Sequence, residues 1–168
     1  MNRFFIATLL FTATLSAEPV APALNGMTLP PDYKDWSVIS MLYRTDTNTL
    51  RVVVGNDIAI NAVRSGKIHP WPNGTSLAKL SWRTKIRANF ENAIIPNKFE
   101  EVGLMIKDTD KFSSTGGWGF AQWLGKKTTP SGDNENFALE CFACHIAVKE
   151  NDYVFVEPAP LPNDDHAQ

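Results

Sequence analysis

The segment "TSLAKLSW", residues 75–82, decides how this chain folds. Apolar and polar side chains alternate along it, and a period of two residues is typical of a β-strand. The alternation places Ala78, Leu80 and Trp82 on one face of the strand and Leu77, Lys79 and Ser81 on the other. We therefore expect a β-strand here, with a different set of side chains on each face.

Similar patterns occur on both sides of this segment. The other predicted strands are "DWSVISMLYRT" (35–45), "LRVVVGN" (50–56), "FEEVGLMIKD" (99–108), "GWGFAQWLG" (117–125) and "DYVFVEP" (152–158). Two further segments, "NDIAINAVRSGK" (56–67) and "FALECFACHIAVK" (137–149), favour short helices. The predicted fold class is α+β, a predominantly antiparallel β-sheet with short flanking helices.

The N-terminus has the pattern of a secretory signal peptide. A basic start, "MNR", precedes the uncharged run "FFIATLLFTATL" at residues 4–15. This run is shorter than the roughly 20 residues that a membrane-spanning helix needs. We expect cleavage of residues 1–17, with a second possible site after Ala23, and a periplasmic mature protein without a membrane anchor.

The mature chain is expected to form one domain. Residues 18–32 are predicted to be a loose N-terminal lead-in, residues 33–158 the domain itself and residues 159–168 a flexible tail. Loss of Arg3 with the signal peptide reduces the 16 basic residues to 15, against 18 acidic ones. This balance gives no reason to expect binding to nucleic acid or to an anionic membrane.

The two cysteines of the chain lie in the predicted C-terminal helix. Cys141, Cys144 and His145 form a Cys-x-x-Cys-His sequence, which is the attachment pattern of c-type haem. Residues at i, i+3 and i+4 share one side of a helix. Both thiols can therefore bond to one edge of the porphyrin, and the imidazole can reach the iron. We predict one covalently bound haem c per chain, with His145 as the iron ligand.

Other uses of the two cysteines remain open. A redox disulfide of the thioredoxin kind is expected after an early strand at the start of a helix, and not near the C-terminus. A structural zinc site needs about four ligands, and the chain has no further cysteine. A structural disulfide is possible but does not require His145.

The second axial position of the iron is predicted to be open. No methionine follows His145, whereas small electron-transfer cytochromes place an axial methionine downstream. The remaining candidates are His69, His166, Met41 and Met105. An open position favours small-molecule chemistry, and a six-coordinate electron-transfer cytochrome is the alternative.

Several segments together resemble the cytochrome P-460 family, which includes the cytochromes c'-beta. They are "RVVVGNDIA", "PNGTSLAKL", "IKDTDKF", "GGWGFAQW" and "CFACH…NDYVF", in that order, across about residues 33–157. The resemblance implies a β-rich subunit, usually a homodimer, with one haem against the sheet and aromatic residues on its distal side. Aromatic candidates are Trp36, Trp71, Trp82, Trp118, Trp123, Phe112 and Phe120.

The resemblance also implies two site residues. Lys79 has the spacing of the lysine that bonds to the porphyrin in cytochromes P-460. Their distal glutamate, which acts in hydroxylamine oxidation, corresponds here to Gly103. Glu101 lies two residues earlier, on the same strand face, and is the candidate for a shifted base.

The resemblance implies chemistry on small nitrogen species. One function is hydroxylamine oxidation, which would make the protein an oxidoreductase. The other is binding of nitric oxide without turnover, as in the c'-beta branch, and the glycine at position 103 favours it. The sequence does not identify a redox partner.

Overall fold

A computed structural model describes residues 19–160 and 162 of the chain. The strands are β1 (Ser37–Arg44), β2 (Thr49–Gly55), β3 (Ser76–Arg87), β4 (Phe90–Lys107), β5 (Trp118–Leu124) and β6 (Thr129–Pro130). The helices are α1 (Asp57–Arg64) and α2 (Phe137–His145), with 3-10 turns η1 (Tyr33–Asp35), η2 (Ser113–Thr115) and η3 (Ile146–Asn151). The α+β fold class is confirmed. The predicted signal peptide and most of the predicted tail lie outside the described residues.

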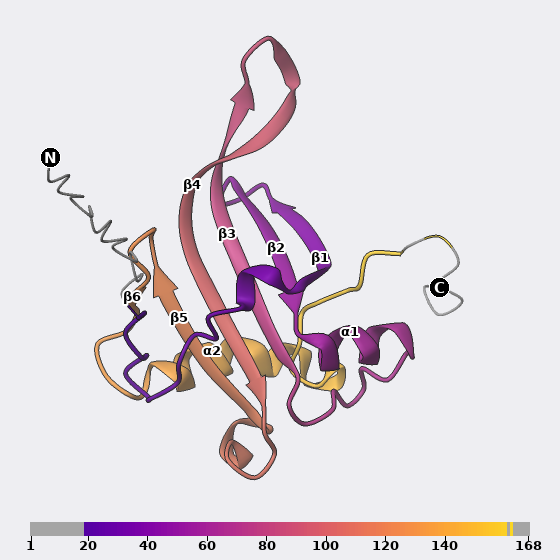
Figure 1. The fold of residues 1–168 in the computed structure, drawn as a ribbon, viewed down its shortest axis with the longest axis vertical. Helices are drawn as coiled ribbons and strands as arrows, with labels where there is room; N and C mark the ends of the chain where they lie inside the picture. The colour runs from indigo at the N-terminus through magenta and orange to yellow at the C-terminus, as the bar shows by residue number, and fades with distance from the viewer. Residues whose placement is uncertain (1–18, 161, 163–168) are drawn as a thin grey trace, which may run out of the picture.

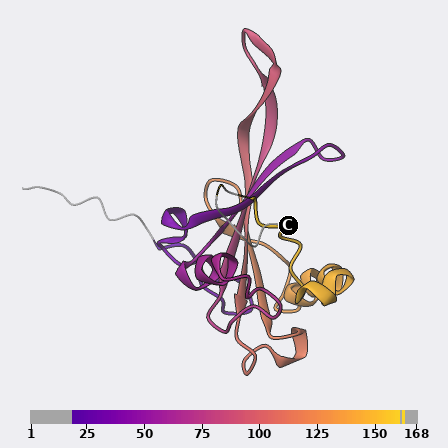
Figure 2. The same ribbon diagram turned by 90° about the vertical axis from the view of Figure 1, so that its right-hand side faces the viewer.

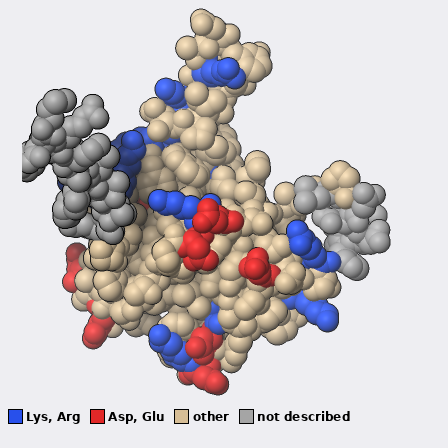
Figure 3. All heavy atoms as spheres, viewed as in Figure 1, with Lys and Arg blue, Asp and Glu red and all other residues tan. Residues whose placement is uncertain are grey.

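The six strands form one antiparallel sheet in chain order, from β1 to β6. Each strand therefore pairs with its neighbour in sequence, and short turns suffice to connect antiparallel strands. The hairpin of β3 and β4 extends beyond the other strands as a two-stranded arm (Figure 1). Ile86 and Ile94 face each other across the arm and are 63% and 49% exposed. The visible charged side chains on the arm in Figure 3 are lysines and arginines.

The N-terminal segment, residues 19–36, covers one face of the sheet, which we call the closed face. Met27, Leu29 and Tyr33 are buried there against Ala78 and Leu104. Figure 2 shows this segment (indigo) on the opposite side of the sheet from α2 (yellow). The prediction of a loose lead-in is wrong, because these apolar side chains bury surface that the sheet would otherwise expose.

The helices pack on the other face, which we call the helix face. Ala59 of α1 and Phe142 of α2 join one apolar cluster with Leu77 and Phe120 of the sheet. The helix α1 is capped by Asn56, whose side-chain oxygen accepts hydrogen bonds from the backbone N–H groups of Ala59 at 3.0 Å and of Ser76 at 3.2 Å. This cap connects α1 to the start of β3.

Two predicted elements differ from the structure. Residues 152–158 form no strand and instead run along the helix face, where Val154 is buried. The sixth strand is β6, which lies in a segment for which the sequence pattern predicts no strand. In the described part of the chain, no helix is long and apolar enough to cross a membrane.

Candidate functional site

The helix α2 presents its two cysteines and its histidine next to the helix face of the sheet. Cys141 is half-buried, whereas Cys144 is exposed, and the two thiols are not joined to each other. Phe142 packs its ring on Phe120 of β5, with centroids 6.2 Å apart. Burial raises the pKa of the Cys141 thiol, and the nearby Lys79 ammonium opposes this shift.

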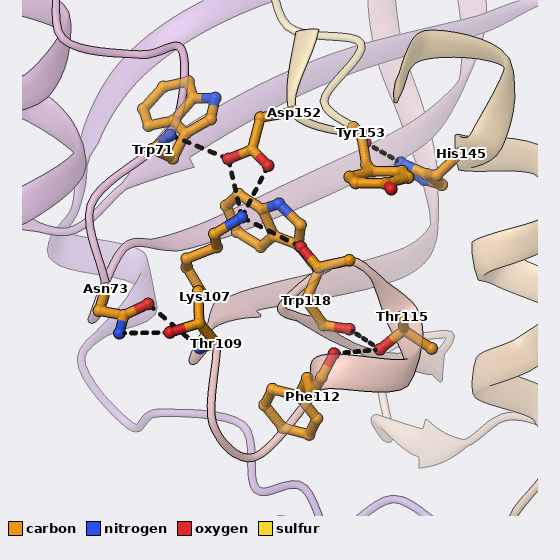
Figure 4. Close-up of polar contacts among 11 residues, drawn as sticks. Trp71, Asn73, Lys107, Thr109, Phe112, Thr115, Trp118, His145, Asp152 and Tyr153 are labelled. Carbon is orange, nitrogen blue, oxygen red and sulfur yellow. Dashed lines mark hydrogen bonds and ion pairs between the residues drawn. The ribbon is translucent and has the colours of Figure 1, made fainter. Parts of the chain in front are cut away.

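His145 is held from two directions. Its ring lies between Phe120 and Phe155, with centroid distances of 5.0 and 5.1 Å. Its Nδ1–H donates a hydrogen bond of 2.7 Å to the carbonyl oxygen of Tyr153 (Figure 4). This bond fixes the tautomer that carries its proton on Nδ1, which leaves Nε2 with a free lone pair.

Burial favours the neutral form of the His145 imidazole. Burial lowers the pKa of His145 and the Lys79 ammonium lowers it further, although the hydrogen bond to Tyr153 acts in the opposite direction. A neutral imidazole is the form that binds a metal ion. The Lys79 ammonium lowers the pKa values of both Cys141 and His145.

Lys79 and Glu101 meet on the helix face. The Lys79 ammonium lies 2.8 Å from a carboxylate oxygen of Glu101. Lys79 pairs in register with Gly103, so that Glu101 is its diagonal neighbour on β4. The Lys79 side chain reaches Glu101 by crossing Gly103, because a Cβ atom there would lie 3.5 Å from Lys79 Cε. The ion pair between the two predicted site residues therefore lies directly over Gly103.

Three polar side chains next to this pair had no role in the sequence-based prediction. Ser81 contacts one carboxylate oxygen of Glu101 at 3.3 Å, and the Gln122 amide donates to the other. Arg51 lies in the same cross-strand row as Ser81, and its Nε is buried without a hydrogen-bond partner among the described residues. Alternation along each strand is consistent with Arg51, Ser81 and Gln122 lying on the same face as Lys79. The strand register shows that they are neighbours.

The residues of this face fit a haem. Among the described residues, leaving aside Gly103 and its two chain neighbours, only the Lys79 side chain would lie within 4 Å of a Cβ atom at position 103, so the surface of the sheet is open here. Exposed apolar side chains surround the site: Leu42, Leu124, Ile146 and Phe155 are 42%, 45%, 50% and 55% exposed. Apolar surface of this kind is buried when a flat, largely apolar porphyrin covers it. The His145 imidazole and the two free thiols supply the ligand and the attachment points that c-type haem uses.

The sheet separates the other candidate residues into two sets. The helix-face cluster contains three of the aromatic candidates, Trp71, Trp118 and Phe120. The closed face holds the other four: Trp36, Trp123, Phe112 and Trp82, of which Trp82 packs on Phe99.

The candidates for a second iron ligand are also divided by the sheet. Met105 lies on the helix face, but Met41 pairs with Val52 and points to the closed side. His69 is exposed, and His166 lies outside the described residues. Among the described residues, no three His, Cys, Asp or Glu side chains gather as a metal site requires.

Comparison with known proteins gives one match. A family model described as Cytochrome P460 matches residues 30–156, which include every strand, both helices and the site described above. No curated protein matches the chain.

Proposed function

The chain belongs to the cytochrome P460 family, which makes haem its cofactor, and we propose that it holds one haem c on the helix face through Cys141, Cys144 and His145. The observation that carries this proposal is the arrangement of α2. It places two unpaired thiols at i and i+3 and a neutral imidazole with a free Nε2 beside an exposed apolar surface. In this proposal the cysteines form thioethers, and His145 is the proximal ligand.

We propose that the protein acts in the periplasm on small nitrogen species. A haem bound through His145 would supply an iron with a second ligand position for a small molecule. On the described helix face, Met105 is the one methionine candidate for that position, and it packs against the apolar cluster of that face. We therefore favour a five-coordinate haem, with six-coordinate electron transfer through Met105 as the alternative.

Binding of nitric oxide without turnover is the function that we favour. Hydroxylamine oxidation requires removal of protons, and a well-placed general base contributes roughly 10²–10⁴-fold to such steps. Gly103 offers no side-chain acceptor, and the oxygens of Glu101 are engaged by Lys79, Ser81 and Gln122. A neutral diatomic ligand needs no proton acceptor in the pocket.

One observation favours hydroxylamine oxidation as a second candidate. The 2.8 Å contact places the amine of Lys79 beside the carboxylate of Glu101. If the Lys79 amine is bonded to the porphyrin, it no longer serves Glu101 as an ammonium partner. Glu101 is then the group on this face that would accept substrate protons.

The first experiment tests haem attachment and ligand binding. The protein is produced with the periplasmic haem-attachment machinery, and we expect haem that stays bound in acidified organic solvent. The reduced protein should give a high-spin spectrum and bind nitric oxide tightly. A colourless product refutes the haem proposal, and a low-spin spectrum that Met105→Ala converts to high spin supports the electron-transfer alternative.

A second experiment separates the two candidate functions. Lys79→Ala removes both the amine and the ion pair, whereas Lys79→Arg keeps a cationic partner for Glu101 but lacks the amine. If Lys79 is bonded to the porphyrin, mass spectrometry should find the residue-79 peptide joined to haem in the wild type and in neither variant. Both variants should also show an ordinary c-type optical spectrum. The binding-only function would be overturned if the wild type oxidises hydroxylamine and Glu101→Gln abolishes this turnover. Gly103→Glu should raise turnover if the rest of the site is competent.

We also propose that the protein is a homodimer. The exposed apolar side chains Ile86, Phe90 and Ile94 on the arm support this proposal, because isolated β-ribbons with such residues are stabilised when another surface covers them. Sedimentation analysis of the mature protein tests it. A monomer at micromolar concentration contradicts it.

A further inference from the structure

A buried ion pair lies beneath the turn that follows α2. The Lys107 ammonium lies 2.7 and 2.9 Å from the two carboxylate oxygens of Asp152. The Lys107 and Asp152 side chains are only 4% and 11% exposed. The ammonium also donates to the carbonyl of Gly116 at 3.1 Å, and the Asp152 carboxylate accepts from the backbone N–H of Trp71 at 2.9 Å (Figure 4).

This pair holds the residue that orients His145. Asp152 is followed directly by Tyr153, whose carbonyl accepts the 2.7 Å hydrogen bond from His145 Nδ1. Asp152 and Tyr153 have φ values of 51° and 64°, in the left-handed region that residues other than glycine rarely adopt. Such a conformation is strained and persists only where surrounding contacts impose it. The ion pair and the Trp71 N–H supply those contacts.

The ring of Tyr153 is fixed from a second side. It packs on Phe142 of α2, with centroids 5.4 Å apart, and on the backbone of Gly116. A Cβ atom at Gly116 would lie 2.2 Å from the Tyr153 ring, so that only glycine permits this approach. Lys107 bonds both to the Gly116 carbonyl and to Asp152, so the same ammonium contacts the residue that packs on the Tyr153 ring and the residue that precedes Tyr153.

The position of the pair in the fold explains why a buried charge is present here. Burial of two charges has a desolvation cost that their attraction often only matches, so a buried pair is weak evidence for a stabilising role. The pair instead joins the end of β4, the loop at Trp71 and the turn after η3, which are distant in sequence. Its clearest effect is to fix where the Tyr153 carbonyl lies.

We propose that Lys107 and Asp152 are positioning residues for His145. They hold the Tyr153 carbonyl against Nδ1–H and thereby set the strength of that hydrogen bond. When an imidazole binds a metal through one ring nitrogen, a hydrogen bond from the other ring N–H to an acceptor makes the imidazole more basic. The ion pair thus affects the midpoint potential of the iron through the Tyr153 carbonyl and the His145 imidazole, without contact with haem or substrate. This inference rests on the proposed role of His145 as the proximal ligand.

The test uses the holo-protein and the double variant Lys107→Met/Asp152→Asn. Asparagine tolerates the left-handed conformation and keeps an acceptor for the Trp71 N–H, and the double change leaves no unpaired buried charge. We expect the iron–histidine stretching band of the ferrous protein to move to lower frequency and the midpoint potential to rise. Gly116→Ala is an independent second variant, because it displaces the Tyr153 ring and leaves both charges in place.

The control is Glu100→Gln, which breaks the exposed ion pair between Glu100 and Arg83 on the same sheet. It should leave the stretching band and the potential at their wild-type values. If the double variant and Gly116→Ala both keep the wild-type band while losing thermal stability, the pair is merely structural and the positioning role is overturned. If the wild type itself holds no haem, or holds it without His145 as the ligand, it is the proposed function that fails.

Discussion

The two faces of the sheet are made by the same strands but have opposite chemistry. On β3, Ala78 points to the closed face and its neighbour Lys79 to the helix face. On β4, Leu104 points to the closed face and Met105 to the helix face. The closed face is filled by the chain's own N-terminal segment. The helix face retains an ion pair, a buried arginine nitrogen and exposed apolar side chains around α2. The difference separates the face that the chain itself covers from the face on which we propose that haem binds.

The largest effect on stability is expected on the closed face. Leu104 is 1% exposed, and Leu104→Ala should lower the free energy of unfolding by about 2–5 kcal/mol, because it leaves a cavity in a packed core. Denaturant unfolding measures this change. The haem spectrum should stay unchanged, since the side chain points away from the site. The matched variant Met105→Ala should cost less stability, and a larger loss than that of Leu104→Ala would contradict the distinction between the faces.

A smaller loss is expected where α1 joins the helix face. Asn56→Ala removes the cap of α1 and the bond to Ser76, and should destabilise the protein by about 0.5–2 kcal/mol. Thermal unfolding of the holo-protein provides the measurement. Asn56→Asp is the control, because it keeps the capping oxygen. Equal losses in the two variants would show that the cap does not cause the effect.

The ion pair of the site should contribute little to stability. Lys79 and Glu101 side chains are 37% and 18% exposed, and ion pairs that water reaches contribute about 0–1 kcal/mol. Glu101→Gln should therefore change the unfolding free energy by less than about 1 kcal/mol, while it alters the affinity for nitric oxide or any hydroxylamine turnover. A large stability loss without any change in ligand chemistry would assign Glu101 to the core and not to the site.

The smallest effect concerns pH. Burial raises the pKa of Tyr33 on the closed face. The unfolded chain then loses this proton at a lower pH than the folded protein does, so stability is fully present below a pH of about 10 and falls as the pH rises above it. Tyr33→Phe should remove this part of the alkaline loss, as unfolding midpoints between about pH 9 and pH 11 can show. Parallel pH profiles for variant and wild type would refute the assignment.

The sheet was largely predictable because alternation is a local signal. It assigned Ala78 and Lys79 to opposite faces and placed Glu101 on the face of Gly103, as the register confirms. It was misleading at residues 152–158, where alternating apolar residues follow two left-handed residues and pack without a strand partner. The mixed composition of residues 18–32 likewise concealed that Met27 and Leu29 close a face of the sheet.

The sequence by itself determined the fold class, the two-faced sheet and the Cys-x-x-Cys-His cluster, because each depends on spacings of a few residues. Only the tertiary structure decided that Lys79 crosses Gly103 to reach Glu101, and that Lys107 pairs with Asp152 beneath Tyr153. These contacts join residues 22 and 45 positions apart. Strand register and chain packing set such distances, and no local periodicity encodes them.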